Sequence, residues 1–172
     1  MKGNLIITSD TAQAFERSID MMETCIKEMR RVAYNMMPEV LVESGLNIAL
    51  KDYCNNINQS GALNLNYHSI GIDDSNIDQT TSIAIYRIVQ ELINNTIKHA
   101  AAKKAIVQVS QSEDLLTLTV EDDGIGFDPV ILQRVKGIGW LNIQSRIDFL
   151  KGTLDVQSGE GKGTSVHIEL NA

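Results

Sequence analysis

The sequence has little cysteine, proline or aromatic residue, and it lacks a long apolar run. Among its 172 residues the two cysteines, Cys25 and Cys54, stand alone and do not have the paired spacing of a metal site. Isolated thiols weakly favour a reducing compartment. Because no apolar run approaches the ~20 residues of a membrane span and no signal peptide is visible, we expect a cytoplasmic chain. Any membrane anchor of a parent protein would lie upstream of Met1.

Positive charge is also scarce. Lys and Arg number 15 against 22 Asp and Glu, which gives a formal net charge of −7. This balance argues against nucleic-acid binding through a broad basic surface. Apolar residues make up 43% and charged residues 22% of the chain, as in ordinary soluble proteins. The length suits one domain with a small appendage.

The order of periodic segments predicts an α+β fold. Apolar patterning predicts helices over residues 10–37, 46–56, 79–101 and 140–150, and strands over residues 63–70, 104–110, 115–121, 153–158 and 163–170. Helices and strands do not alternate regularly, and short turns join the late strands. We therefore expect a two-layer α/β sandwich with a mixed sheet and helices on one face, preceded by a long helix.

The first predicted helix carries a heptad pattern. Asp10 and Gln13 resemble a capping pair, and Pro38 ends the helix. The apolar positions alternate spacings of four and three over three repeats: Phe15, Ile19, Met22, Ile26, Met29, Ala33 and Met36. An amphipathic helix packed on the chain's own core would explain part of this pattern. The strict period of 3.5 residues favours a helical bundle or a dimer.

The helix over residues 79–101 has one polar side. At 100° per residue, Glu91, Asn94, Asn95 and Lys98 fall within roughly one 100° arc, opposite an apolar side formed by Ile85, Val89, Leu92, Ile93 and Ile97. A solvated face would explain Glu91 and Lys98. Two adjacent Asn residues are less expected there, because Asn is a mediocre helix former. Amide and carboxylate oxygens together suit Mg²⁺, which commonly bridges phosphates.

Glycines punctuate the second half of the chain. Asp122-x-Gly124-x-Gly126 follows a strand and combines an acceptor with two positions of close backbone approach. Gly137-Ile-Gly139 precedes a helix whose first amides could hold an anion. Lys162, Gly163 and Thr164 open the last strand, in a stretch that lacks the spacing of a P-loop. Each of these motifs alone is weak, and the order of all four is more specific.

In this order the motifs resemble the GHKL ATPase superfamily, which includes DNA gyrase and the histidine kinases. The resemblance covers about residues 78–172 and implies a site for ATP and Mg²⁺. Glu91 and Asn95 match the family's N-box pair, with Asn95 as the Mg²⁺ ligand. Lys98 would add positive charge near the phosphates, and Glu91, Asn95 and Lys98 would be the catalytic residues. Asn94 and His99 are expected to line the same nucleotide site.

The resemblance also implies an adenine site. Asp122 matches the residue that accepts a hydrogen bond from the adenine amino group, with Gly124 and Gly126 beneath the base. Thr164, preceded by Gly163, matches the residue that assists this aspartate.

A further part of the resemblance concerns the cover of the site and the subfamily. Gly137 and Gly139 match the hinge of a lid over the phosphates, and residues 133–136 would close over the γ-phosphate. The stretches "QELINNTIKHA", "DDGIGFD" and "GIGWLNIQSRIDFL" resemble the short-lid sensor histidine kinases of the nitrate-sensor type.

The same resemblance divides the chain. Residues 1–56 would be part of a dimerisation region, its second helix and exit, and residues 57–172 the ATP-binding catalytic domain. The family's phosphoacceptor is a His-Asp pair on the preceding helix, and the only histidines here are His68, His99 and His167. We therefore expect ATP binding without autophosphorylation. The implied partners are a second copy of the chain, through the heptad helix, and the receiver domain of a response regulator.

Two other functions stay open on the sequence alone. One is an anti-sigma-factor-type serine kinase or partner-binding protein, which would share the ATP fold. The heptad helix and the "NMMPE" exit argue against it. The other is a nucleotide-binding scaffold without turnover. The presence of Glu91, Asn95 and Asp122 together argues against that alternative.

Overall fold

The computed structural model describes residues 15, 17–19, 21–22, 39–113, 115–133 and 137–171. The chain from Glu39 onward forms one compact unit. Most of the helix predicted over residues 10–37 lies outside the described residues, and the few residues described within it are helical. The heptad seam and its role in dimerisation therefore stay predictions.

The compact unit begins with α2, Glu39–Ser60, which is longer than the predicted helix over residues 46–56. Gly45 breaks it with a φ of 83°, a left-handed conformation that favours glycine. The helix restarts at Leu46, whose N–H donates to Asp74 Oδ1 at 2.7 Å, so a residue 28 positions away caps it. Asp74 comes from the short 3₁₀ helix η1, Asp74–Asn76, which lies between the strand predicted over residues 63–70 and the helix predicted over residues 79–101.

A five-stranded mixed sheet forms the second layer. Its strands are β1 (Asn64–Ile70), β2 (Lys104–Ser112), β3 (Leu115–Asp122), β4 (Thr153–Ser158) and β5 (Thr164–Asn171). Their order is β1-β2-β3-β5-β4. Strands β1 and β2 pair in parallel, while the three other pairings are antiparallel. The predicted mixed sheet is confirmed.

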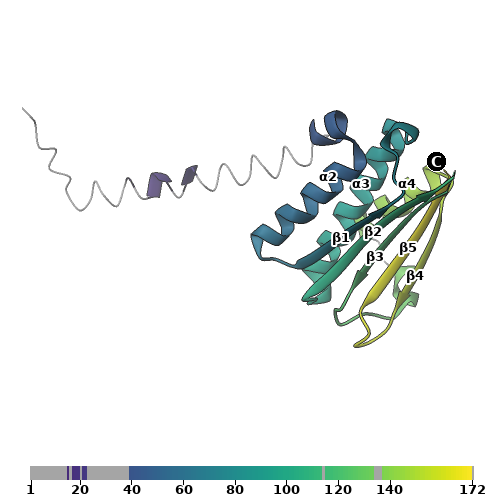
Figure 1. Cartoon of the computed structure of the whole chain (residues 1–172). Helices are drawn as coiled ribbons and strands as arrows, with labels where there is room; N and C mark the ends of the chain where they lie inside the picture. Colours follow the sequence, from purple (N-terminus) through teal and green to yellow (C-terminus); the bar gives the residue numbers. More distant parts are fainter. Residues whose placement is uncertain are drawn as a thin grey trace, which may run out of the picture. The chain divides into compact units, whose positions relative to one another are not determined.

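The helices cover one face of this sheet (Figure 1). Besides α2 they are α3 (Gln79–Asn95), which continues into a π-helical turn η2 (Thr96–Ala100), and α4 (Ile138–Phe149); the 3₁₀ helix η3 (Pro129–Gln133) precedes α4. The alternating buried residues of β2, β3 and β5 pack against buried leucines and isoleucines of the helices in one core. The predicted α/β sandwich is therefore confirmed.

Helix α2 packs on β1 and α3 within this unit. Its buried side chains include Leu46, Leu50 and Cys54. The compact unit thus starts before the boundary that we predicted between residues 56 and 57. The assignment of residues 1–56 to a dimerisation region stays a prediction.

One residue that we predicted on the apolar side of the helix over residues 79–101 is not buried. Ile97 is 36% exposed, whereas Thr96 beside it is only 5% exposed. The change coincides with the π-helical turn, whose wider i→i+5 bonding alters the helical phase after Asn95. The projection at 100° per residue therefore misplaced Ile97.

In the part of the chain that the structure describes, no helix combines the length and apolar character needed to cross a bilayer.

Candidate functional site

A cavity of about 570 Å³ opens between α3–η2, the end of β3, the glycine loop and the start of α4. This volume lies within the range of about 300–1,000 Å³ typical of small-molecule sites. Its polar lining side chains are Glu91, Asn95, Thr96, Lys98, His99, Asp122 and Thr164. Its apolar lining side chains are Leu92, Val120, Ile125, Phe127, Ile131, Leu132, Trp140, Val156 and Val166.

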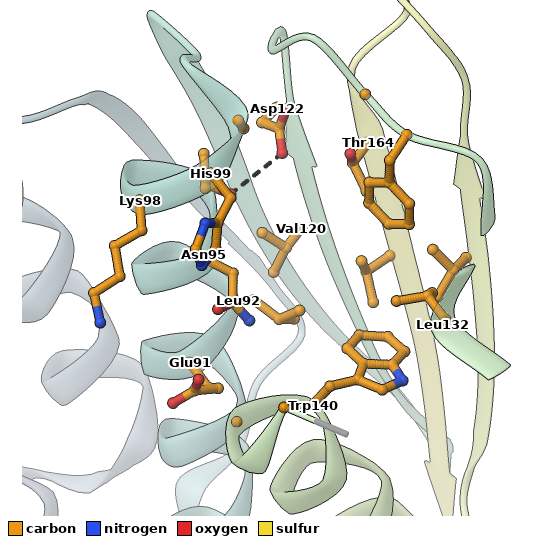
Figure 2. Close-up of a pocket in the computed structure, with 18 of the residues that line it drawn as sticks. Glu91, Leu92, Asn95, Lys98, His99, Val120, Asp122, Leu132, Trp140 and Thr164 are labelled. Carbon is orange, nitrogen blue, oxygen red and sulfur yellow. Dashed lines mark hydrogen bonds between the residues drawn. The ribbon is translucent and has the colours of Figure 1, made fainter. Parts of the chain in front are cut away.

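The helix α3 and its π-helical turn supply one wall. Glu91, Asn95, Lys98 and His99 lie along it, with β3 beside them (Figure 2). Asn94 does not line the cavity and is exposed. In projection it lies at the edge of the polar arc, about 100° beyond Asn95 and away from Leu92, whose side chain is in the cavity. The structure thus brings together four of the five polar residues predicted on this helix.

Asp122 stands at the end of β3 and is held by both carboxylate oxygens. Oδ1 accepts the backbone N–H of Gly124 at 2.9 Å. Oδ2 accepts the hydroxyl of Thr96 at 3.2 Å. A carboxylate offers about four lone-pair positions, so acceptor capacity is left for a ligand in the cavity.

The neighbouring Asp123 has a different role. Its Oδ1 accepts the backbone N–H groups of Lys103 and Lys104, both at 2.8 Å, at the start of β2. The hydrogen bond from the Lys104 backbone is the largest cause that lowers the pKa of Asp123. The two adjacent acids therefore have different roles. Asp122 lines the cavity, and Asp123 binds the backbone at the start of β2.

The glycines of the loop allow backbone segments to approach closely. A Cβ on Gly124 would lie 2.4 Å from the carbonyl oxygen of Ala100, and one on Gly126 would lie 2.0 Å from that of Gly159. Gly126, with a φ of 63°, lines the cavity, while Gly124 and Gly163 are not among its lining residues. Gly163 instead packs against the backbone of Asp122.

Helix α4 begins against Glu91. Gly137 is its N-cap and offers no capping side chain. A Cβ on Gly139 would lie 1.9 Å from Glu91 Oε1, so a larger residue at this position would require the Glu91 carboxylate to move. A carboxylate at a helix N-terminus is electrostatically favourable. Both Gly137 and Gly139 line the cavity.

Thr164 enters from β5, where it is the register partner of Asp122. Its Oγ1 lies 3.1 Å from Ser158 Oγ. Ser158 also accepts from the backbone N–H of Phe127 at 2.9 Å, which ties the glycine loop to β4. The predicted assistance of Thr164 to Asp122 stays a prediction, and the hydroxyl bonded to Asp122 is that of Thr96.

Sequence reasoning missed two lining residues, the polar Thr96 and the largely apolar Trp140 with its one polar group, the indole N–H. On the helical projection Thr96 lies between Leu92 and Val89, within the apolar side of the helix. A buried hydroxyl needs a hydrogen-bond partner, so a threonine at this position could have indicated a polar contact. Trp140 lies in the first turn of α4, across the cavity from Glu91 (Figure 2). Its indole nitrogen is buried and has no hydrogen-bond partner in the described part of the chain. No pattern around Trp140 in the sequence indicated this position.

Two other predictions concern the cover of the site and the histidines. Of the predicted lid, residues 134–136 lie outside the described residues. His99 is the histidine that lines the cavity. His68 is exposed on β1, and His167 on β5 lies with Nδ1 3.0 Å from Thr119 Oγ1 and Nε2 3.5 Å from Glu169 Oε1.

Residues 80–172 match the protein family described as "Histidine kinase-, DNA gyrase B-, and HSP90-like ATPase". The chain belongs to this family. The match spans α3 and everything after it, which includes every wall of the cavity. ATP use follows from membership in this ATPase family, and the resemblance drawn from the four motifs is confirmed.

Curated relatives are named as histidine kinases. The chain is 30% identical to the sensor histidine kinase MctS of Rhizobium johnstonii, over 90% of this chain and 34% of that protein. It is 28% identical to the signal transduction histidine-protein kinase/phosphatase DegS of Brevibacillus brevis, over 87% and 38% respectively. The chain thus spans little more than a third of the length of these relatives. Their names agree with the predicted resemblance to sensor histidine kinases, while the nitrate-sensor-type subfamily stays a prediction.

The fold agrees with a solved kinase domain. The histidine kinase domain of the blue-light activated histidine kinase from Erythrobacter litoralis superimposes with a TM-score of 0.60 at 27% identity, covering 73% of this chain and 60% of that one.

Proposed function

We propose that the chain is the ATP-binding catalytic module of a bacterial two-component sensor histidine kinase. It would transfer the γ-phosphoryl group of ATP to a histidine on a dimerisation helix that this chain does not contain. The observation that carries the proposal is the cavity, in which the polar side of α3–η2 meets Asp122 within the matched ATPase region.

The adenine end of the cavity would lie at Asp122. Its carboxylate lines the cavity and keeps unused acceptor capacity, so it would accept a hydrogen bond from the amino group of the base. Apolar side chains such as Val120, Ile125 and Val166 line the same cavity and suit a flat ring. Gly126, at the edge of the cavity, lets the backbone come near the base.

The phosphates would lie toward Asn95 and Lys98. Lys98 would offset phosphate charge, and the carboxylate of Glu91 would orient or deprotonate the acceptor. Asn95 would hold Mg²⁺ through its amide oxygen, and the ion would supply further charge neutralisation. The donors fit such an ion, because Mg²⁺ takes few protein ligands and completes its shell with phosphate oxygens and waters. Within the described residues no group of three or more His, Cys, Asp or Glu side chains could form a metal cage of its own.

The acceptor would come from another segment. Phosphoryl transfer needs the attacking nitrogen in line with the bond to the leaving ADP, with the reacting atoms about 3–3.5 Å apart. His99 is fixed on the helical wall of the cavity and is poorly placed for this attack. The proposal therefore includes a dimeric parent protein, with the response regulator as the next acceptor, acting in the cytoplasm.

Labelling with γ-³²P-ATP tests this function. The chain alone should bind nucleotide and stay unlabelled, and adding a segment with the family's His-Asp helix should give acid-labile, alkali-stable label on that segment. Acid-labile, alkali-stable label on the chain itself would instead place the acceptor at one of its own three histidines. Absence of nucleotide binding under any condition would refute the proposal.

A further inference from the structure

The hydroxyl of Thr96 has an unusual partner for a helical threonine. A threonine inside a helix commonly donates to a carbonyl of the preceding turn. Thr96 instead donates to Asp122 Oδ2 at 3.2 Å, across 26 residues of chain. Only 5% of Thr96 is exposed, so its hydroxyl is shielded from bulk water and this bond replaces a solvent contact.

The bond from Thr96 acts together with the one from Gly124. The N–H of Gly124 holds Asp122 Oδ1 at 2.9 Å, and the Thr96 hydroxyl holds Oδ2. One donor belongs to the loop that follows β3 and the other to the helical wall of the cavity. Because each oxygen is fixed by a different element, the plane of the carboxylate is fixed as well. A carboxylate held by one oxygen alone would be free to turn about its last side-chain bond.

We infer that Thr96 is a positioning residue that gives the site its preference for a purine bearing a 6-amino group. This inference rests on the proposed function and deepens it. With the carboxylate plane fixed, the remaining lone pairs of Asp122 point to one position in the cavity. A hydrogen-bond donor at that position is therefore bound more tightly. Without the Thr96 bond the same carboxylate meets the base in several orientations. Recognition of the amino group then weakens, whereas contacts with the rest of the nucleotide stay.

The test compares two ligands that differ only in this amino group. ATP and purine riboside 5′-triphosphate, which lacks the 6-amino group, are titrated by calorimetry against the parent chain and four variants. Thr96→Val and Thr96→Ala remove the hydroxyl, Thr96→Ser keeps it, and Asp122→Asn changes the acceptor itself. The pair Ser and Ala differs only by the hydroxyl, so the comparison survives if the Val variant does not fold. Thermal unfolding of each variant reports stability separately.

We expect ATP to bind about tenfold more weakly to Thr96→Val and Thr96→Ala, the effect of losing one hydrogen bond to a charged group. Purine riboside triphosphate should change by less than about twofold, and Thr96→Ser should restore the preference for ATP. A purely structural threonine would weaken both ligands equally, and this result would overturn the inference. An unchanged ratio in the Val and Ala variants would overturn it too.

Failure of the wider proposal would look different. If the parent chain binds neither triphosphate, the proposed function fails and the inference falls with it. If the parent chain binds ATP and Asp122→Asn lowers the preference while the Thr96 variants do not, the nucleotide site stands and only the role of Thr96 is wrong.

Discussion

Replacing Asp122 by Asn is the sharpest test of the adenine site, because the change alters one group without changing the size of the side chain. In the parent chain the N–H of Gly124 points at one carboxylate oxygen and the hydroxyl of Thr96 at the other. An Asn must keep its single oxygen toward Gly124, whose backbone donor cannot reverse. Its amide nitrogen then lies next to Thr96, whose hydroxyl can turn and accept.

The fold should therefore tolerate the substitution, whereas the affinity for ATP should fall. In the Asp122→Asn variant the new amide would present N–H groups to the cavity where a carboxylate oxygen was available. The amino group of adenine would meet a donor in place of an acceptor. Losing one such hydrogen bond costs about 1–3 kcal/mol, which corresponds to a roughly 5- to 150-fold weaker affinity for ATP.

Calorimetric titration of ATP with Mg²⁺ measures the effect, and Asp123→Asn is the matched control. It makes the same chemical change one residue away, on a side chain that bonds the start of β2 and does not line the cavity. We expect the control to bind ATP within about twofold of the parent chain. Equal affinity of the Asp122→Asn variant and the parent chain would remove Asp122 from the adenine site, and equal losses in both variants would point to a folding defect.

Three further changes and one pH dependence can be measured. Asn95→Ala should reduce the Mg²⁺ dependence of triphosphate binding more than it reduces adenosine binding, and equal losses for both ligands would indicate misfolding. Gly139→Ala should weaken ATP binding severalfold in titration, because its methyl group would overlap the Glu91 carboxylate and displace this side chain from its place in the cavity lining; unchanged affinity would mean that the position of Glu91 is not needed for binding. Ile26→Asp should shift the chain toward monomer in light scattering, and a monomeric parent chain at high concentration would contradict the heptad interpretation. The hydrogen bond from the Thr81 hydroxyl is the largest cause that lowers the pKa of Asp78. The ionised Asp78 should therefore stabilise the folded chain above about pH 4, and this stabilisation should be lost as the pH falls further. The free energy of unfolding of Asp78→Asn, measured with denaturant at several pH values, should lack this loss in acid.

The sequence alone determined the fold class and the place of the site. Alternating apolar residues mark β2, β3 and β5, because a sheet with one buried face imposes a period of two. The polar arc of α3 and the order of the glycine motifs identified the elements that enclose the cavity. Glu91, Asn95, Lys98 and Asp122 were found in this way, since local periodicity and motif spacing are properties of the chain itself, although the same arc also included Asn94, which does not line the cavity. His99 was expected only from the resemblance to the ATPase family.

Only the tertiary structure decided which neighbouring residue does which task. Asp122 and Asp123 are alike in sequence. They differ because the backbone N–H groups of Lys103 and Lys104, at the entry to β2, donate to Asp123, whereas the hydroxyl of Thr96 in η2 donates to Asp122. Thr96 was hidden within an apolar helical side, and its partner lies 26 residues away. The contact between Gly139 and Glu91 likewise joins two helices that the sequence keeps apart. Such pairings depend on how the sheet and the helices pack, and local patterns carry no record of them.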